Sequence, residues 1–351
     1  IMAKVKIQGH ASGTGVLTVT APNTSTDRTI TLPDATGTLA TTGEVGATSI
    51  NGLSDAVISA DNNIGLGSGA VDSITTGDAN TGVGINSLTA NTTGQLNTAV
   101  GYESLLSNVS GQRLTAVGKS ALQNNTGSFN TAVGSVALEN NTSGQQNTAL
   151  GDYALNANTT ASSNTALGQG AMMVNTTGYS NVSVGTNAMA ANTTGKENTV
   201  IGTNAMDANT TASNNAAFGY AALGANTTGA SNTAVGYESL LNNTTANQNT
   251  ALGNASLMSA TTGNDNVAAG YKALKSVTTG THNIGIGHRT GDYQNTLTTG
   301  HFNILIGGYC HTSGADASRQ IVMGDSVVGS AENSLTIGNG GTDSAIAFGA
   351  T

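Results

Sequence analysis

The sequence predicts an all-β protein, a parallel β-solenoid or β-roll of about fifteen 17-residue coils that follows a non-repeat β segment. Three observations predict this class. A glycine recurs every 17 residues, period-two apolar stretches precede each glycine, and only 8% of the 351 residues are charged. The repeat divides the chain into residues 1–60, 61–307 and 308–351.

Residues 1–60 lie outside the repeat and are predicted to cap the first coil. Period-two alternation predicts strands over 14–20 and 28–33, and residues 33–37 have the composition of a turn. A cap is needed because the open edge of a sheet otherwise pairs with other chains. Neither a signal-peptide run nor an 18-residue apolar stretch occurs, so we expect no membrane insertion.

Residues 61–307 carry the repeat N-T-A-V-G-x-x-A-L-x-x-N-T-T-G-x-x, whose 17 positions we number from its first asparagine, Asn97 in one coil. Twelve of the thirteen intervals between the position-5 glycines, from Gly67 to Gly287, are 17 residues. The exception, Gly118 to Gly134, has 16 and lacks one residue of the Asn-Thr-Thr-Gly segment. We therefore expect this deletion to fall in a turn.

The strand at positions 2 to 4 has one inward and one outward face. We expect positions 2 and 4, such as Thr98 and Val100, to point inward. The small residue at position 3, such as Ala99, would then face another backbone or a symmetry mate. The Ala-Leu pair at positions 8 and 9 forms the other wall, and Gly at positions 5 and 15 permits the positive φ of the corners.

Position 12 is an asparagine in successive coils. Stacking at about 4.8 Å places these amides above one another, so we expect a structural ladder of hydrogen bonds. Position 1 offers a second ladder, which includes Asn97. The position-12 ladder is predicted to contain Asn91, Asn108, Asn141, Asn158, Asn175, Asn192, Asn209 and Asn226.

Residues 308–351 are predicted to continue as tapering coils. Apolar stretches end at Gly324, Gly338 and Gly349, and the spacings of 14 and 11 residues between these glycines predict shorter coils. Cys310 occupies position 8, which is normally alanine, so we expect a small buried thiol.

The ionisable residues form no catalytic constellation, so we expect no enzyme, no cofactor and no metal site. His282, His288, His301 and His311 fall near Cys310, but without a ligand spacing such as H-x-H. The net charge of −9 argues against binding to nucleic acid.

Positions 6 and 7 vary from coil to coil and are predicted to be exposed. Aromatic rings there could bind sugars by stacking and by hydroxyl hydrogen bonds, or they could occupy tolerant solvent positions. The candidate contact residues are Tyr102, Tyr153, Tyr220, Tyr237, Tyr271 and His288.

The N-T-A-V-G strand followed by Ala-Leu resembles the repeat of trimeric autotransporter adhesin heads, which are left-handed parallel β-rolls in trimers. This resemblance implies a left-handed, homotrimeric assembly, with an intertwined triple β-helix as the open alternative. Residues 13–41, which include Leu32-Pro33-Asp34-Ala35-Thr36-Gly37, and the repeats over 97–303 resemble bacteriophage tail fibres. In many such fibres a tract like 320–349 precedes a self-cleaving chaperone domain, which implies a mature product.

The resemblance implies a structural protein of a bacteriophage virion, a tail fibre shaft that projects from the particle for host-surface attachment. Its implied partners are further copies of itself, a tail or baseplate protein bound through residues 1–60, and a host-surface glycan or protein. An ice-binding solenoid is one alternative, but stacked threonines such as Thr92-Thr93 lie beside a corner instead of mid-strand. A cell-surface adhesin is the other, and the sequence shows no signal peptide or anchor for it.

Overall fold

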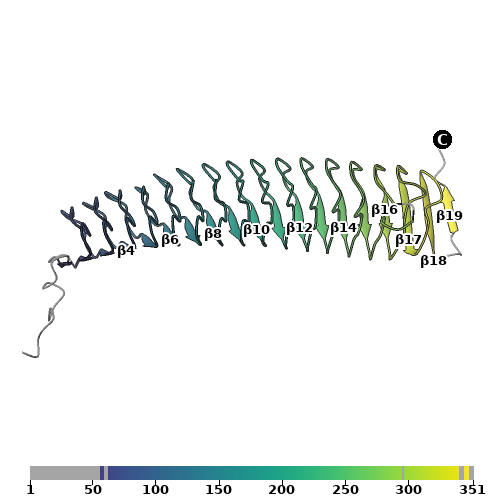
Figure 1. The fold of residues 1–351 in the computed structure, drawn as a ribbon. Coiled ribbons are helices and arrows are strands. Elements are labelled where there is room, and N and C mark those ends of the chain that lie inside the picture. The colour runs from purple at the N-terminus through teal and green to yellow at the C-terminus, as the bar shows by residue number, and fades with distance from the viewer. Residues whose placement is uncertain (1–55, 59–61, 295, 340–343, 348–351) are drawn as a thin grey trace, which may run out of the picture. The chain divides into compact units, whose positions relative to one another are not determined.

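The computed structural model describes residues 56–58, 62–294, 296–339 and 344–347, and these contain strands and turns but no helix. They form a parallel β-solenoid, which confirms the predicted fold class (Figure 1). Contacts divide the chain into residues 1–49 and 50–351. The cap and strands predicted within 1–60 lie outside the described residues, apart from 56–58.

Each coil contributes one short strand at positions 2 to 4, where β-branched and aliphatic residues favour extended backbone. The strands are β1 (Ala56–Ile58), β2 (Ile64–Leu66), β3 (Thr81–Val83), β4 (Thr98–Val100), β5 (Thr115–Val117), β6 (Thr131–Val133), β7 (Thr148–Leu150), β8 (Thr165–Leu167), β9 (Val182–Val184), β10 (Thr199–Ile201), β11 (Ala216–Phe218), β12 (Thr233–Val235), β13 (Thr250–Leu252), β14 (Val267–Ala269), β15 (Ile284–Ile286), β16 (Ile304–Ile306), β17 (Gln320–Asp325), β18 (Ser334–Asn339) and β19 (Ser344–Ala347).

The strands β2 to β18 pair in parallel, and equivalent residues of successive coils lie side by side, as Thr98 and Thr115 do. In Figure 1 the arrows form one row along one side of the stack, and turns form the rest of each coil. The turns are also joined between coils: the N–H of Leu105 donates to the carbonyl of Ala121 at 3.1 Å. Each coil is therefore bonded to its neighbours by both sheet and turns.

Position 3 faces the interior, so the expected orientation of the strand is wrong. Ala149 at position 3 is fully buried, whereas Val100 and Leu150 at position 4 are 37% and 43% exposed. The cause is a thin interior. A Cβ added to Gly285 at position 3 would lie 2.5 Å from Cγ of Leu274, at position 9 of the preceding coil. The small residues at position 3 therefore make room for this chain's own core and mark no symmetry mate.

Positions 8 and 9 form the opposite wall as predicted, because Ala121 and Leu122 are both fully buried. The two walls are complementary in size. In one C-terminal coil position 9 is Gly291, and Leu305 at position 3 of the next coil fills the space. A Cβ on Gly291 would lie 3.2 Å from Cδ1 of Leu305. A large residue on one wall is thus matched by a small one on the other.

Positive φ occurs at position 5, as predicted, but not at position 15. Gly101 at position 5 has a φ of 139°, and a Cβ there would lie 2.6 Å from the carbonyl carbon of Gly118. At position 15, a Cβ on Gly111 would lie 2.7 Å from the carbonyl oxygen of Gly127. Position 15 is thus usually glycine because the backbone of the next coil leaves little room for a Cβ, and not because its φ is positive.

Three further positions are left-handed although they are not glycine. Positions 7, 9 and 17 have φ values of 56°, 51° and 54° in Glu103, Leu105 and Arg113. This conformation costs about 1–2 kcal/mol for a residue with a Cβ. Each of these residues donates its N–H to a neighbouring coil, as Glu103 does to Ile85 at 2.9 Å. The bonds between coils therefore compensate for the unfavourable φ.

Both ends of the parallel stack are covered by a reversed strand. β1 pairs with β2 in antiparallel fashion, and β19 pairs in the same way with β18. The 14-residue spacing from Gly324 to Gly338 does produce a shorter parallel coil, since β17 and β18 are parallel. The predicted 11-residue coil is wrong. Only residues 340–343 separate β18 from β19, too few to return the chain for a parallel strand.

Candidate functional site

The predicted aromatic row is exposed along one wall of the stack. Tyr102, Tyr153 and Tyr220 are each 47% exposed, and Tyr237 and Tyr271 are 49% and 43% exposed. These side chains stand beyond the position-5 corner, which turns the chain away from the outer face of the sheet. They are therefore available to a ligand from solvent.

The structure brings four of the six candidates together in two pairs. Tyr220 and Tyr237 stack with ring centroids 5.3 Å apart, and Tyr271 and His288 stack at 5.2 Å. Tyr102 and Tyr153 join no ring pair among the described residues. Tyr153 occupies position 7, while the stacked residues occupy position 6. Only residues at the same position of adjacent coils stack directly.

Sequence reasoning missed two aromatic residues of this wall. Tyr309 packs its ring against the edge of His288 at 4.9 Å and against Tyr293 at 5.2 Å. Tyr293 belongs to the longer coil that precedes Gly307, so no equivalent position exists in the other coils. The repeat therefore could not predict that Tyr293 lies beside Tyr309.

Two tyrosines of the wall have an acidic neighbour. Hydrogen bonding to Glu103 and the negative charge of that residue raise the pKa of Tyr102. Glu238 raises the pKa of Tyr237 in the same way. In both cases the acidic neighbour favours the protonated hydroxyl, which donates the hydrogen bond.

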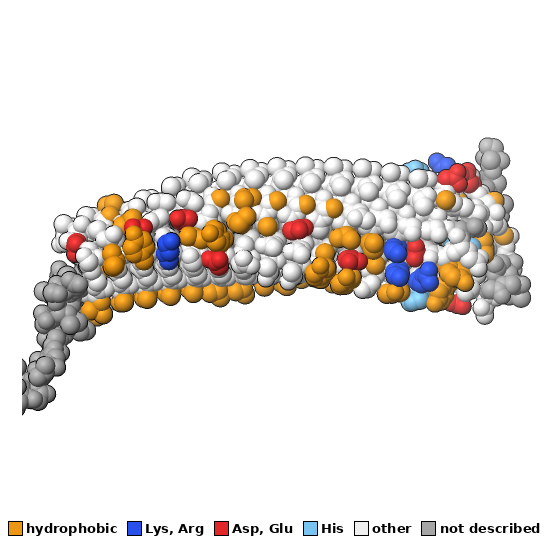
Figure 2. Space-filling view, viewed as in Figure 1, with side chains coloured by type: hydrophobic (Ala, Val, Ile, Leu, Met, Phe, Trp, Pro, Cys, Tyr) orange, Lys and Arg blue, Asp and Glu red, His pale blue; other side chains and the backbone are white. Residues whose placement is uncertain are grey.

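A second candidate surface is the outer face of the sheet, which sequence reasoning placed inside. Position 4 carries an aliphatic or aromatic residue in nearly every coil, and Leu150, Leu167 and Leu252 are 41–43% exposed. Position 2 is mostly threonine, and no residue at positions 2 or 4 from β2 to β16 is charged. Figure 2 shows the resulting apolar row along the strand side of the stack.

The asparagines of positions 1 and 12 lie inside the stack and do not form a binding surface. At position 12, Nδ2 of Asn158 donates to Oδ1 of Asn141 at 2.7 Å, and this bond recurs between most successive coils. The residues Asn91, Asn108, Asn141, Asn158, Asn175, Asn192, Asn209 and Asn226 are all fully buried. At position 1, Oδ1 of Asn147 accepts the backbone N–H of Asn164 at 3.0 Å. Both rows hold coils together.

The C-terminal histidines are engaged separately. His282 stacks on Phe302 at 4.7 Å, and His311 is buried with Nδ1 3.1 Å from the carbonyl oxygen of Thr312. Cys310 is buried, and its Sγ lies 2.9 Å from Oγ1 of Thr290. Burial raises the pKa of this thiol, against the opposing effect of the Thr290 hydrogen bond. Within the described residues, no three His, Cys, Asp or Glu side chains are arranged to hold a metal ion.

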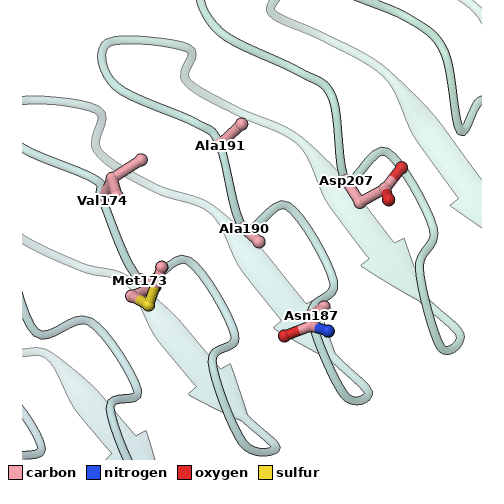
Figure 3. A pocket seen from close by; sticks show the side chains of 6 residues that line it. All are labelled: Met173, Val174, Asn187, Ala190, Ala191 and Asp207. Atoms are coloured by element: carbon pink, nitrogen blue, oxygen red, sulfur yellow. The ribbon is translucent and has the colours of Figure 1, made fainter.

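A shallow groove of about 340 Å³ crosses three neighbouring coils (Figure 3). Its floor is Ala190 and Ala191, and the side chains of Met173 and Asp207 stand on either side. Partial burial raises the pKa of the Asp207 carboxyl, although backbone hydrogen bonds act in the opposite direction. The groove has one carboxylate and no nucleophile or base beside it, so it offers no catalytic arrangement.

Comparisons with known proteins give no functional assignment, so any functional inference depends on the surfaces described above. No protein-family model, no curated protein and no solved structure matches this chain. In the described part of the chain, no helix is long and apolar enough to cross a membrane.

Proposed function

We propose that this protein is a structural fibre shaft that assembles with copies of itself through the outer face of its sheet. The observation that carries the proposal is the uncharged row of aliphatic residues at position 4, which recurs from coil to coil. Monomeric proteins rarely expose continuous apolar surfaces of this kind. Covering the row would add burial that a thin solenoid interior does not supply.

The proposed occupant of the row is a second copy of this chain. The position-4 side chains recur once per coil along the stack. A partner must present side chains at the same spacing to contact each of them. Copies of this chain in parallel orientation satisfy this condition along the full stack. A threefold bundle would place the position-4 rows of three chains around one axis. The small residues of position 3, which we first expected to face another backbone or a symmetry mate, are buried within each chain.

We further propose that the shaft belongs to a bacteriophage virion. The resemblance of residues 13–41 and of the repeats to tail fibres supports this assignment. Residues 1–60 would dock on a tail or baseplate protein, and the coils would project toward the host surface. A stack held by bonds between every pair of coils suits such a mechanical role.

The experiment is the solution mass of the full chain by light scattering. A mass near three times the chain mass of 34.6 kDa supports the threefold shaft, and a monomer at all concentrations overturns it. The variant Leu150→Lys with Leu167→Lys places two charges in the row and should release monomers. Its control is Ile85→Lys with Leu96→Lys, at exposed apolar residues outside positions 2 and 4. Equal disruption by the control would contradict assembly through the sheet.

A second candidate function rests on the corrected orientation of the strand. Position 2 presents Thr98, Thr115 and Thr131 outward as the first residue of each strand, so their side chains form a threonine row on the sheet face of the kind that an ice-binding solenoid needs. A face buried between chains cannot also bind ice. A monomer that shows thermal hysteresis would therefore support ice binding and exclude the shaft.

A further inference from the structure

The C-terminal coils carry an aromatic and basic cluster that we name the C-terminal patch. Four of the ten Lys and Arg residues of the chain lie between residues 272 and 319, although the net charge is −9. In Figure 2 most of the basic side chains on the visible face gather near this end, beside His and apolar side chains. The patch comprises Tyr271, Lys272, Lys275, His288, Arg289, Tyr293 and Tyr309.

The rings of the patch form one connected group. Tyr271 stacks on His288 with 16° between the ring planes, His288 meets Tyr309 edge-on, and Tyr309 meets Tyr293 edge-on. Because stacking covers the ring faces, the solvent meets mainly ring edges and hydroxyl groups. Ring edges carry the positive part of the aromatic quadrupole and favour a negative ligand atom.

Cations flank these rings. Nζ of Lys272 lies 5.0 Å from the centroid of Tyr271, and Cζ of Arg289 lies 5.6 Å from that of Tyr293. The carboxylate of Asp292 lies 3.9 Å from Nε of Arg289 and accepts a hydrogen bond from Ser276. A second carboxylate, that of Asp325, lies one coil beyond Tyr309, beside Gly308. No carboxylate among the described residues forms an ion pair with Lys272 or Lys275.

The chain contains a natural counterpart with the opposite charge. Tyr220 and Tyr237 stack at nearly the same distance and angle as Tyr271 and His288. The residue after Tyr237 is Glu238, whereas the residues after Tyr271 and His288 are Lys272 and Arg289. A comparison of the two ring pairs therefore separates the contribution of ring stacking to ligand binding from the contribution of charge.

We propose that the C-terminal patch binds an acidic polysaccharide, a polymer of sugar rings that bear carboxylate groups. Lys272, Lys275 and Arg289 would pair with the carboxylates, and the tyrosine hydroxyls would hydrogen-bond the sugar hydroxyls. The patch lies around the corner from position 4, so assembly through the sheet leaves it open. This inference rests on the proposed role in host-surface attachment and names the class of ligand for it.

The test is a titration of the full chain with alginate, a polyuronate, and with uncharged dextran, at 50 and 300 mM salt. We expect binding to alginate alone, weaker at the higher salt because ions screen exposed charges. Lys272→Gln with Lys275→Gln should weaken binding about five- to tenfold, as expected for two surface ion pairs. The matched control, Lys119→Gln with Lys196→Gln, changes the net charge equally and should leave the affinity unchanged.

Two further variants test the rings. His288→Ala removes a stacked ring of the patch and should weaken alginate binding, while Tyr237→Ala at the acidic counterpart should not. Three results would each overturn the inference. The chain could bind dextran as well as alginate, the two lysine double variants could have equal effects, or the assembled rod could fail to bind alginate. A trimer that does not bind alginate overturns the polysaccharide site but supports the proposed shaft. A monomer that binds alginate overturns the proposed shaft but supports the polysaccharide site.

Discussion

Asn158 and Asn175 lie one coil apart, and Nδ2 of Asn175 donates to Oδ1 of Asn158 at 3.0 Å. Both side chains are fully buried, and the same Nδ2 also donates to the carbonyl of Gly178 at 2.9 Å. Oδ1 of Asn175 in turn accepts from Asn192 at 2.7 Å. One amide thus satisfies polar groups in three coils, whereas Oδ1 of Asn243, where Ala260 follows in the next coil, has no partner among the described residues.

We predict that Asn175→Ala lowers the free energy of unfolding by about 2–3 kcal/mol, because it leaves buried polar groups of neighbouring coils unpaired. Asn243→Ala should cost about 1 kcal/mol, since no following amide depends on it. Urea denaturation of the two variants measures the difference. Equal effects would show that the ladder does not couple successive coils.

The adjacent residues Ala149 and Leu150 test the orientation of the strand. Ala149→Leu should lower the free energy of unfolding by about 1–3 kcal/mol, because a larger side chain does not fit the thin core. Leu150→Val, a residue that other coils carry at position 4, should change it by less than about 0.5 kcal/mol. A stable Ala149→Leu variant with impaired assembly would instead place position 3 at an interface.

Cys310 should resist thiol reagents in the folded chain. Its pKa is raised above 9.0 by burial, so little thiolate forms at neutral pH, and the sulfur is shielded from solvent. Reaction with Ellman's reagent should be at least about 100-fold slower than in urea. Above pH 9 the unfolded thiol ionises before the folded one, so stability should fall as pH rises, and Cys310→Ala should remove this component.

Asp207 should make the free energy of unfolding depend on pH in the acidic range. Partial burial raises its pKa above the usual 3.8, so the folded state holds the proton more tightly and the charged form is disfavoured at neutral pH. Asp207→Asn should therefore stabilise the chain at pH 7, by at most a few tenths of a kcal/mol because the group is partly solvated. Below pH 3.8 the gain should vanish. A gain that persists at pH 3 would contradict the electrostatic cause.

The repeat period was sufficient to predict the stack, its parallel strands and the buried wall at positions 8 and 9. Leu122 could be assigned to the core because stacking adjacent Ala-Leu pairs from successive coils forms one continuous apolar wall. The face of the strand could not be assigned from alternation alone. Positions 2 and 4 are bulkier than position 3, and position 4 is also apolar, but the usual assumption that large apolar residues point inward fails in an interior this thin.

The surface was predicted only where the repeat itself carried the signal. Stacking of Tyr220 on Tyr237 follows from their equal positions in adjacent coils. Tyr293 lies in extra residues of one coil, and its contact with Tyr309 depends on how that loop folds back. The left-handed φ of Leu105 has no signature in residue type, because it is compensated by a hydrogen bond to another coil.

Two of the coils of irregular length show where the fold tolerates a change in residue number. The 16-residue coil and the 20-residue coil that ends at Gly307 both keep their strands in register, with Thr115 beside Thr131 and Ile284 beside Ile304. Insertions and deletions at the corners are therefore absorbed locally, as expected for surface loops. A foreign peptide inserted there would be displayed at a chosen height along the stack, and peptides in successive corners would be spaced by multiples of about 4.8 Å.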